Sequence, residues 1–176
     1  MDVFWDNGYA STTLDDLMAG TKVGRQSLYD TFGDKRSLYL QALNEYRTST
    51  QAAMRALFAS ELTIQECFRT MLFGICEETR AQHERGCLLL SANLERNTQD
   101  KDVAAIVRRN QSEVGAIFEN AFRDAQSSGQ LAREKDPSAL ASFMLAALQG
   151  MRQAARAASD RTSLELTARV ALSTLD

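Results

Sequence analysis

The sequence predicts an all-α protein, on three observations. Alanine and leucine together supply 46 of the 176 residues, against 10 for valine plus isoleucine, and the first pair favours helix whereas the second favours strand. The chain contains 1 proline, whereas about 5% is ordinary. Apolar residues also recur at helical spacing along most of the chain. With 44% hydrophobic residues, the chain can bury a core as one domain, or as a small domain fused to a larger one.

Three short helices are expected in the N-terminal part of the chain. The first is brief and stops at residues 7–8, so the sequence reads as if it begins inside that helix. Hydroxyl side chains at residues 11–13 are N-caps for the second helix. The third helix is expected at about residues 25–32, before the stop at Gly33. Two short helices separated by about four residues are the layout of a helix-turn-helix.

The rest of the chain also predicts helices, each with its own start or stop signal. Thr63 and Glu66 have capping-box spacing, and Pro137 follows Asp136 where a proline at the first helical position belongs. The expected helices cover about residues 35–59, 64–82, 87–96, 100–128, 137–158 and 163–175. Because the first of these is long and uninterrupted, we place the division between a head of residues 1–47 and a body of residues 48–176 within a helix.

Several classes of protein are excluded by composition. The longest uncharged run, residues 137–151, has 15 residues, fewer than the roughly 20 that a bilayer span needs. No basic-then-apolar leader opens the chain, and 3 cysteines are too few for a disulfide framework. We therefore expect a cytoplasmic protein that has no contact with membranes.

The net charge of −3 conceals an uneven distribution. Residues 1–20 carry 4 acids and no base, whereas residues 21–47 carry 5 bases and 3 acids. The remaining 129 residues carry 15 bases and 16 acids. The second stretch is therefore the only basic part of the chain, and an acidic total does not exclude nucleic acid as a partner.

The second helix of the predicted helix-turn-helix carries the residue types that read DNA. Arg25, Gln26 and Ser27 lie at its N-terminal end, where arginine can pair with guanine and glutamine with adenine. Hydroxyl, aromatic and basic side chains nearby are phosphate-contact types, and helix N-termini add backbone N–H groups. The predicted DNA-contact residues are Thr12, Thr13, Gly24, Arg25, Gln26, Ser27, Tyr29, Thr31 and Lys35.

The head resembles the TetR family of transcriptional regulators. The pattern is a phenylalanine, a glycine–aromatic pair, a hydroxyl-capped helix and a Leu-Tyr-x-x-Phe-x-x-Lys close. The residues that carry it are Phe4, Gly8, Tyr9, Thr12, Thr13, Leu14, Leu17, Val23, Ser27, Leu28, Tyr29, Phe32, Lys35 and Leu38. The body is similar in layout, with Gly86-Cys87-Leu88-Leu89, a long central helix, Asp136-Pro137 and Gly150.

Three departures from the family's pattern bear on DNA binding. Lys22 stands where the family usually has glycine in the turn, and a left-handed conformation there would cost a non-glycine residue about 1 kcal/mol. Asp30 and Thr31 replace an aromatic and a histidine, and Asp30 would repel phosphate if it pointed that way. The family's basic arm and most of its first helix are absent, so the resemblance implies an N-terminally trimmed chain.

The resemblance implies an apolar ligand cavity in the body and a two-fold dimer, without saying which atoms line either. The aromatic and apolar stripes are as expected of an ordinary core, and the polar candidates could equally lie on the surface. The candidate pocket residues are Phe68, Met71, Leu72, Ile75, Asn93, Ile106, Asn110, Phe143 and Gln149. We expect the last two long helices to carry apolar surface that a monomer leaves exposed. The candidate interface residues are Phe143, Met144, Ala147, Leu148, Met151, Leu164, Val170 and Leu172.

Cys87 and His83 are the remaining candidates for chemistry. Some TetR relatives sense oxidants through a cysteine beside a similar Gly-Cys-Leu, but a cysteine that opens an apolar run usually acts as a small hydrophobe. One histidine without a His-Glu-x-x-His or paired Cys-x-x-Cys motif predicts no metal site, no catalytic residues and no cofactor.

The resemblance therefore implies a ligand-responsive regulator, and most simply a repressor. We expect it to bind a palindromic double-stranded operator as a homodimer and to be released by a small apolar or amphipathic effector. A helical small-molecule-binding dimer that does not bind DNA is the alternative.

Overall fold

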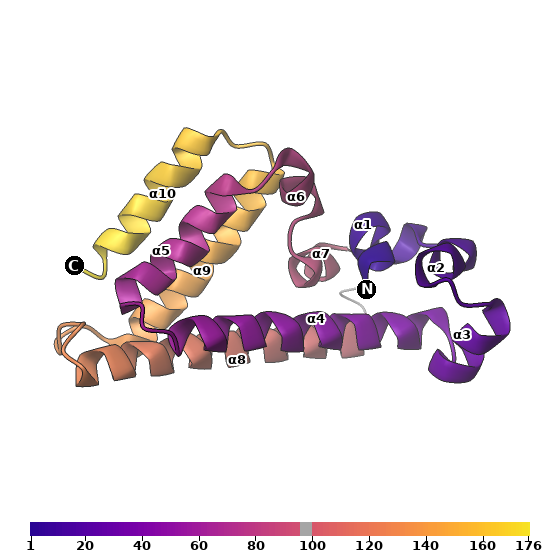
Figure 1. Cartoon of the computed structure of the whole chain (residues 1–176), viewed down its shortest axis with the longest axis horizontal. Helices are drawn as coiled ribbons and strands as arrows, with labels where there is room; N and C mark the ends of the chain where they lie inside the picture. Colours follow the sequence, from indigo (N-terminus) through magenta and orange to yellow (C-terminus); the bar gives the residue numbers. More distant parts are fainter. Residues whose placement is uncertain (96–99) are drawn as a thin grey trace. The chain divides into compact units, whose positions relative to one another are not determined.

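The computed structural model describes residues 1–95 and 100–176, and within these residues it contains helices and no strand (Figure 1). The all-α prediction is confirmed. The N-terminal helices are α1 (Asp2–Ser11), α2 (Leu14–Thr21), α3 (Arg25–Phe32) and α4 (Lys35–Phe58). The following helices are α5 (Ile64–Glu77), α6 (Arg80–Arg85), α7 (Leu88–Leu94), α8 (Lys101–Ser127), α9 (Pro137–Arg156) and α10 (Arg161–Ser173). The predicted helix end near residue 96 lies outside the described residues.

One predicted helix, at residues 64–82, is two helices in the structure. The backbone leaves α5 at Glu78, which is extended, with φ −61° and ψ 144°. Thr79 then caps α6: its hydroxyl accepts the N–H of Gln82, and the Gln82 side chain accepts the N–H of Thr79. This capping box restarts the helix in a new direction.

Helix α1 is interrupted at Gly8, which has φ 75° and ψ 167°. A left-handed φ favours glycine, and a Cβ atom placed there would lie 2.5 Å from Oε1 of Glu95. The Tyr9 N–H next to the break donates to Oε2 of Glu95 at 3.2 Å. The Glu95 side chain at the end of α7 therefore packs against the break in α1, and the positive φ of Gly8 favours glycine at that position.

The described residues form two compact units. The first comprises residues 1–50 and 87–109, and the second residues 51–86 and 110–176. Helices α4 and α8 each contribute to both units. The first unit therefore adds α7 and the start of α8 to the N-terminal helices.

An aromatic cluster lies at the centre of the first unit. The Phe4 and Tyr39 rings meet edge to face at 5.1 Å, and the Tyr9 and Tyr39 rings lie 4.7 Å apart. Burial raises the pKa of the Tyr39 phenol, and the charge of Glu95 adds to this effect. The buried residues of the cluster are Phe4, Leu17, Leu28, Tyr39, Ala42, Leu43, Tyr46, Leu88, Leu89, Ala92, Val103 and Val107. Helices α1 to α4 thus share one core with α7 and α8.

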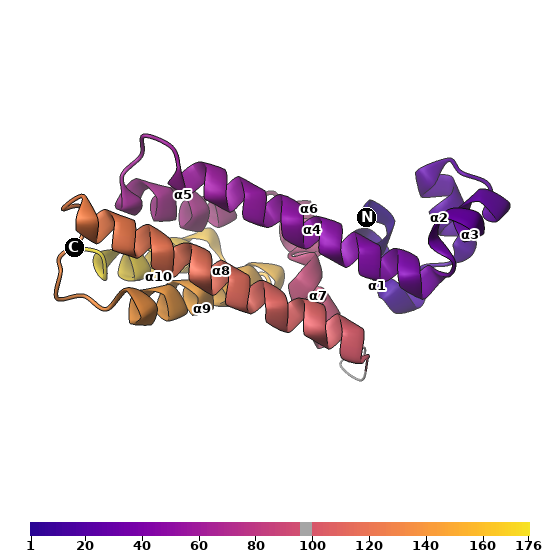
Figure 2. The ribbon, with the colours of Figure 1, turned by 90° about the horizontal axis from the view of Figure 1, so that it is seen from below.

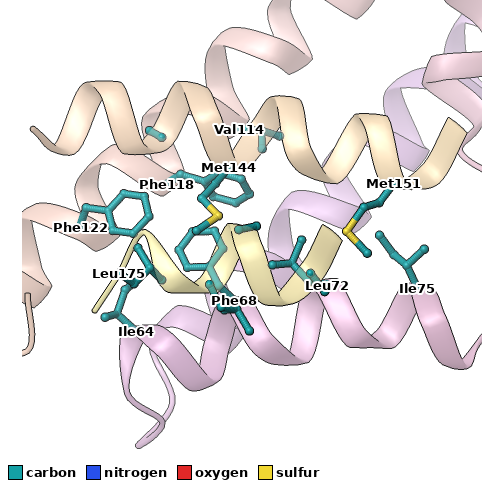
Figure 3. Packing of buried hydrophobic residues seen from close by; sticks show 14 of the residues in the cluster. Ile64, Phe68, Leu72, Ile75, Val114, Phe118, Phe122, Met144, Met151 and Leu175 are labelled. Carbon is teal, nitrogen blue, oxygen red and sulfur yellow. The ribbon is translucent and has the colours of Figure 1, made fainter. Parts of the chain in front are cut away.

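The second unit has a separate core around Phe68 (Figure 3). The Phe68 ring stacks on Phe122 at 4.9 Å, and it meets Phe118 edge to face at 5.1 Å. Met144 and Met151 of α9 point into the same core. Helices α5, α9 and α10 lie side by side around it (Figures 1 and 2).

Candidate nucleic-acid interface

The turn between α2 and α3 is built by caps on both sides. Thr13 begins α2 with a capping box in which its hydroxyl accepts the N–H of Asp16 and its own N–H donates to the Asp16 carboxylate. At the other end, the Lys22 N–H donates to the Met18 carbonyl at 2.9 Å, with Lys22 in the left-handed conformation at φ 59° and ψ 26°. The strain expected for a non-glycine residue in this turn is therefore present.

Replacement of Lys22 by glycine is expected to raise the free energy of unfolding of the first unit by about 1 kcal/mol, because glycine adopts the left-handed conformation without a Cβ penalty. Urea unfolding followed by the fluorescence of Trp5, the single tryptophan, measures it. Lys22→Ala, which removes the same charge but keeps the Cβ, is the matched control. Equal stabilisation by alanine and glycine would contradict the assignment to strain.

Helix α3 has one anchored side and one free side. Leu28 is 4% exposed and is the buried residue of this helix, whereas Arg25, Gln26, Ser27 and Tyr29 are exposed. Gly24 is the N-cap, and no side chain caps the first turn. The arrangement therefore leaves the N-terminal end of α3 open to an external partner, as sequence reasoning expected of a recognition helix.

Acidic side chains lie beside Arg25 and Gln26, the two residues predicted to contact bases. Arg25 lies 3.8 Å from Asp15 of α2, with both side chains largely exposed. Gln26 donates from Nε2 to Oδ1 of Asp30 at 2.8 Å, one helical turn along α3. The open side of α3 thus carries donors and acceptors, not a purely basic surface.

The predicted phosphate-contact residues fall into different environments. Thr13 and Thr31 are exposed, and Nζ of Lys35 lies 4.7 Å from the centroid of the Tyr9 ring. Thr12 differs from expectation: it is 2% exposed, and its hydroxyl donates to the Gly8 carbonyl at 2.6 Å. That hydroxyl completes the backbone hydrogen bonding at the α1 break, so it is not available for a phosphate.

Sequence reasoning missed an ion-pair cluster at the start of α4. Nε of Arg36 donates to Oδ2 of Asp100 at 2.6 Å, and Nη2 donates to Oδ1 of Asp100 at 2.7 Å and to Asp102 at 2.6 Å. Asp100 also accepts the N–H groups of Asp102 and Val103 at the start of α8. Arg36 directly follows Lys35, so this cluster ties the segment after α3 to α8. A separation of 64 residues left no local signal for it.

The Arg36 guanidinium, aided by the N–H donors of α8, lowers the pKa of the Asp100 carboxyl to about 2. A folded-state pKa below the ordinary value stabilises the fold above about pH 4, and this contribution is lost as the pH falls towards 2. Asp100→Asn keeps an N-cap residue without the charge. We expect the free energy of unfolding of the wild type to exceed that of this variant by about 1 kcal/mol near neutral pH. Unfolding experiments from pH 6 to pH 2 should show that difference shrinking, and a constant difference would contradict it.

The nine candidate pocket residues do not gather at one cavity. Phe68, Leu72 and Ile75 are buried in the core of the second unit, and Met71 packs against that core. Asn110 accepts a hydrogen bond from the buried Gln51 at 3.0 Å. Phe143 is exposed and Gln149 partly buried in the second unit, whereas Asn93 and Ile106 belong to the first unit.

A cavity of about 420 Å³ opens in the second unit at another place, between the last turn of α4, the start of α5 and the end of α8. Phe58, Leu62 and Ile117 contribute apolar walls, and Arg55 and Asn120 contribute polar ones. None of the nine candidate residues belongs to its lining. The loop at residues 59–63, which sequence reasoning treated only as a connection, forms part of it.

The eight candidate interface residues also divide. Phe143 and Val170 are 42% and 65% exposed, as expected of an interface, and Ala147 and Leu148 are partly buried. The other four are buried within their own chain, because α9 and α10 pack on α5 and α8 through them: Met144, Met151, Leu164 and Leu172. Their expected exposure is therefore not found. Leu166, which is 58% exposed on α10, was not among the candidates.

Cys87 and His83, the two remaining candidates for chemistry, lie in the following environments. Cys87 is partly buried and precedes α7 without capping it through its side chain. Nε2 of His83 donates to the Ile75 carbonyl at 2.7 Å. Across residues 1–95 and 100–176, no three His, Cys, Asp or Glu side chains gather as metal ligands. In the same residues, no helix is both long and apolar enough to cross a membrane.

Comparisons with known proteins identify both parts of the chain. Residues 1–42 match the family of bacterial regulatory proteins of the tetR type, and residues 71–171 match the C-terminal domain described as tetracyclin repressor-like. The uncharacterised HTH-type transcriptional regulator YezE of Bacillus subtilis (strain 168) is 28% identical, over 100% of this chain and 92% of its own. The HTH-type transcriptional repressor ComR of Escherichia coli (strain K12) is 25% identical, over 99% and 83%.

Solved structures agree with this assignment. A cysteine mutant of the TetR family transcriptional regulator CifR, complexed with 26 bp operator DNA, has a TM-score of 0.82 and 25% identity, covering 99% of this chain and 92% of its own. A TetR family regulator from Cytophaga hutchinsonii shares the fold, with a TM-score of 0.85 and 17% identity over 98% and 87%. The relatives are regulators and not enzymes. The open α3, the two matched domains and these relatives together show that the chain belongs to the TetR family of DNA-binding transcriptional regulators.

Proposed function

We propose that this regulator binds a palindromic operator as a homodimer and that a small effector releases it. The observation that carries the DNA-binding part is α3, whose N-terminal Arg25 and Gln26 are exposed while Leu28 holds the helix on its core. A short helix anchored in this way can enter a major groove with its first turn towards the bases. Together with operator binding, we propose a cytoplasmic location.

The proposed dimer uses the exposed apolar residues of the last two helices. The large exposed apolar side chains on these helices are Phe143 of α9 and Leu166 and Val170 of α10. Gly150 on α9 leaves room for another helix to approach closely. Pairing this surface across a two-fold axis buries it in an isologous interface. The same axis presents two copies of α3 to half-sites about one helical turn apart, which is why we expect a palindrome.

The proposed effector site is the cavity of about 420 Å³ in the second unit. Its apolar walls and the polar groups of Arg55, Asn120 and Asp124 suit a small amphipathic molecule. Two residues separate the end of α3 from the start of α4, and the last residue of α4, Phe58, lines the cavity. Helix α4 therefore offers a physical link between the proposed effector site and α3. A coupling free energy of about 1–3 kcal/mol between the two sites would change operator affinity about 5- to 150-fold.

The test of DNA binding is selection from a random duplex pool by the full chain. We expect enrichment of a palindrome. The molar mass of the selected complex, measured by light scattering, should correspond to two chains per duplex. Absence of enrichment would reject the proposal in favour of a helical small-molecule-binding dimer. With the selected duplex in hand, compounds that raise the thermal stability of the chain can be scored for release. Binding of such compounds without any change in operator affinity would reject the effector mechanism.

Substitutions at the head should separate base contacts from phosphate contacts. Arg25→Ala and Gln26→Ala are each expected to lose about 1–3 kcal/mol at particular base pairs and to relax the preference there. Lys35→Ala should weaken binding to all sequences alike and reduce the salt dependence, because a phosphate contact carries no sequence information. Fluorescence anisotropy on single-base variants of the selected duplex measures both. An unaltered sequence preference in Arg25→Ala and Gln26→Ala would refute the assigned base contacts.

A further inference from the structure

Gln26 and Asp30 form a hydrogen-bonded pair on the side of α3 that faces away from the core. They are one helical turn apart, both are exposed, and Nε2 of Gln26 lies 2.8 Å from Oδ1 of Asp30. At 100° per residue, both positions lie roughly opposite the direction set by Leu28 and Phe32, the residues that hold α3 on its core. Any duplex that meets the outer side of α3 therefore meets this pair.

The carboxylate of Asp30 fixes the orientation of the Gln26 amide. An ionised carboxylate only accepts hydrogen bonds, so the NH₂ group of the amide must face it. The amide oxygen Oε1 then points away from Asp30 and remains free to accept. The pair thus presents oxygen acceptors outward, together with the second N–H of the amide.

Acceptor atoms on a reading helix favour particular bases. In the major groove, the hydrogen-bond donors are the N4 amino group of cytosine and the N6 amino group of adenine. Guanine presents N7 and O6, and thymine presents O4, all of which are acceptors. Oε1 of Gln26, if brought against those atoms, would lose water without gaining a partner, which is costly. The same pair would be satisfied by an amino group.

We propose that Asp30 is a positioning residue that makes Gln26 select a base with an exocyclic amino group, cytosine or adenine, at one position in each half-site. This proposal rests on the proposed operator binding and adds to it which base edge is chosen and by which pair. It also explains how a chain can keep an acidic residue on its recognition helix. Asp30 meets the bases through Gln26, away from the phosphates.

The test compares the duplexes that four full-length chains select from one random pool. The chains are wild type, Asp30→Asn, Gln26→Ala and the double variant. Asparagine is isosteric but can donate as well as accept, so it no longer fixes the amide. Glu45→Gln is the matched control, because it removes one negative charge from an exposed position on α4. Far-ultraviolet circular dichroism of each variant checks that the fold is kept.

We expect wild type to prefer cytosine or adenine over guanine or thymine about ten-fold or more at one position of each half-site. Asp30→Asn should lower that preference to less than about three-fold while the other positions stay unchanged, and Glu45→Gln should keep it in full. In the Gln26→Ala background, adding Asp30→Asn should change nothing further at that position.

Two outcomes would overturn the inference while leaving operator binding intact. One is the same base preference in Asp30→Asn as in wild type. The other is a wild-type preference for guanine or thymine at the position that Gln26→Ala relaxes. If wild type enriches no sequence at all, the proposed operator binding fails and this inference falls with it.

Discussion

Leu28→Ala is expected to destabilise the first unit by about 2–5 kcal/mol, the usual range for truncating a buried leucine, and to abolish sequence-selective DNA binding. Leu28 is the buried residue of α3, a helix of 8 residues. Helices this short do not hold by themselves in water, so α3 depends on the core contact that Leu28 makes. Without it, Arg25 and Gln26 lose the rigid support that positions them.

Hydrogen exchange followed by mass spectrometry localises this effect. Amides of α2 and α3 should exchange faster in Leu28→Ala, whereas those of α5 in the second unit should keep wild-type rates. Val23→Ala is the control, since Val23 is 37% exposed and its truncation should cost less than about 0.5 kcal/mol. A Leu28→Ala protein with wild-type exchange in α3 would show that this helix is not held by its core contact.

Phe68→Ala is expected to cost the second unit about 3–5 kcal/mol, as truncations of buried aromatics do. The Phe68 side chain is fully buried, and its ring contacts Phe58, Phe118 and Phe122. Figure 3 shows Phe68 facing Met144 of α9 within this core. Removal of the ring leaves a cavity where α5, α8 and α9 meet, and a close-packed interior relaxes only partly around such a cavity.

Urea unfolding followed by circular dichroism measures this loss, and hydrogen exchange assigns it to α5, α9 and α10. Leu94→Ala, which truncates an exposed leucine of the first unit, should leave stability within about 0.5 kcal/mol of wild type. A loss below about 1 kcal/mol in Phe68→Ala would show that the aromatic cluster does not hold the second unit together.

Local signals in the sequence predicted several helix boundaries closely, although they missed the break between α5 and α6. The expected third helix, 25–32, coincides with α3, and Pro137 begins α9 as the N1 proline indicated. Caps and stops act over a few residues, and a single sequence shows them directly. The candidate residues on α3 could be chosen from the sequence in the same way. The spacing of Arg25, Gln26 and Leu28 on one short helix already separates an outer side from a buried one.

Features that depend on distant residues could not be predicted. Asp100 contacts Arg36 across 64 residues, and Glu95 contacts Tyr9 across 86. Met144 was assigned to a dimer surface because an apolar stripe does not say whether its own chain or a partner covers it. The Thr12 hydroxyl could donate to a phosphate, but in the structure it donates to the Gly8 carbonyl at the break in α1. In each case the tertiary contact decides between two roles that the residue type allows.

The ratio of affinities for the selected operator and a scrambled duplex of the same composition, measured at one salt concentration, tests the central claim most directly. If α3 reads base edges as proposed, the full chain should bind the operator at least about 10³-fold more tightly than the scrambled duplex, as specific regulators do. Gln26→Ala should lower that ratio, whereas Lys35→Ala should weaken both affinities and leave the ratio unchanged. A ratio near one for the wild-type chain would mean that it contacts phosphates alone, and would contradict the assignment of α3 as a reader of sequence.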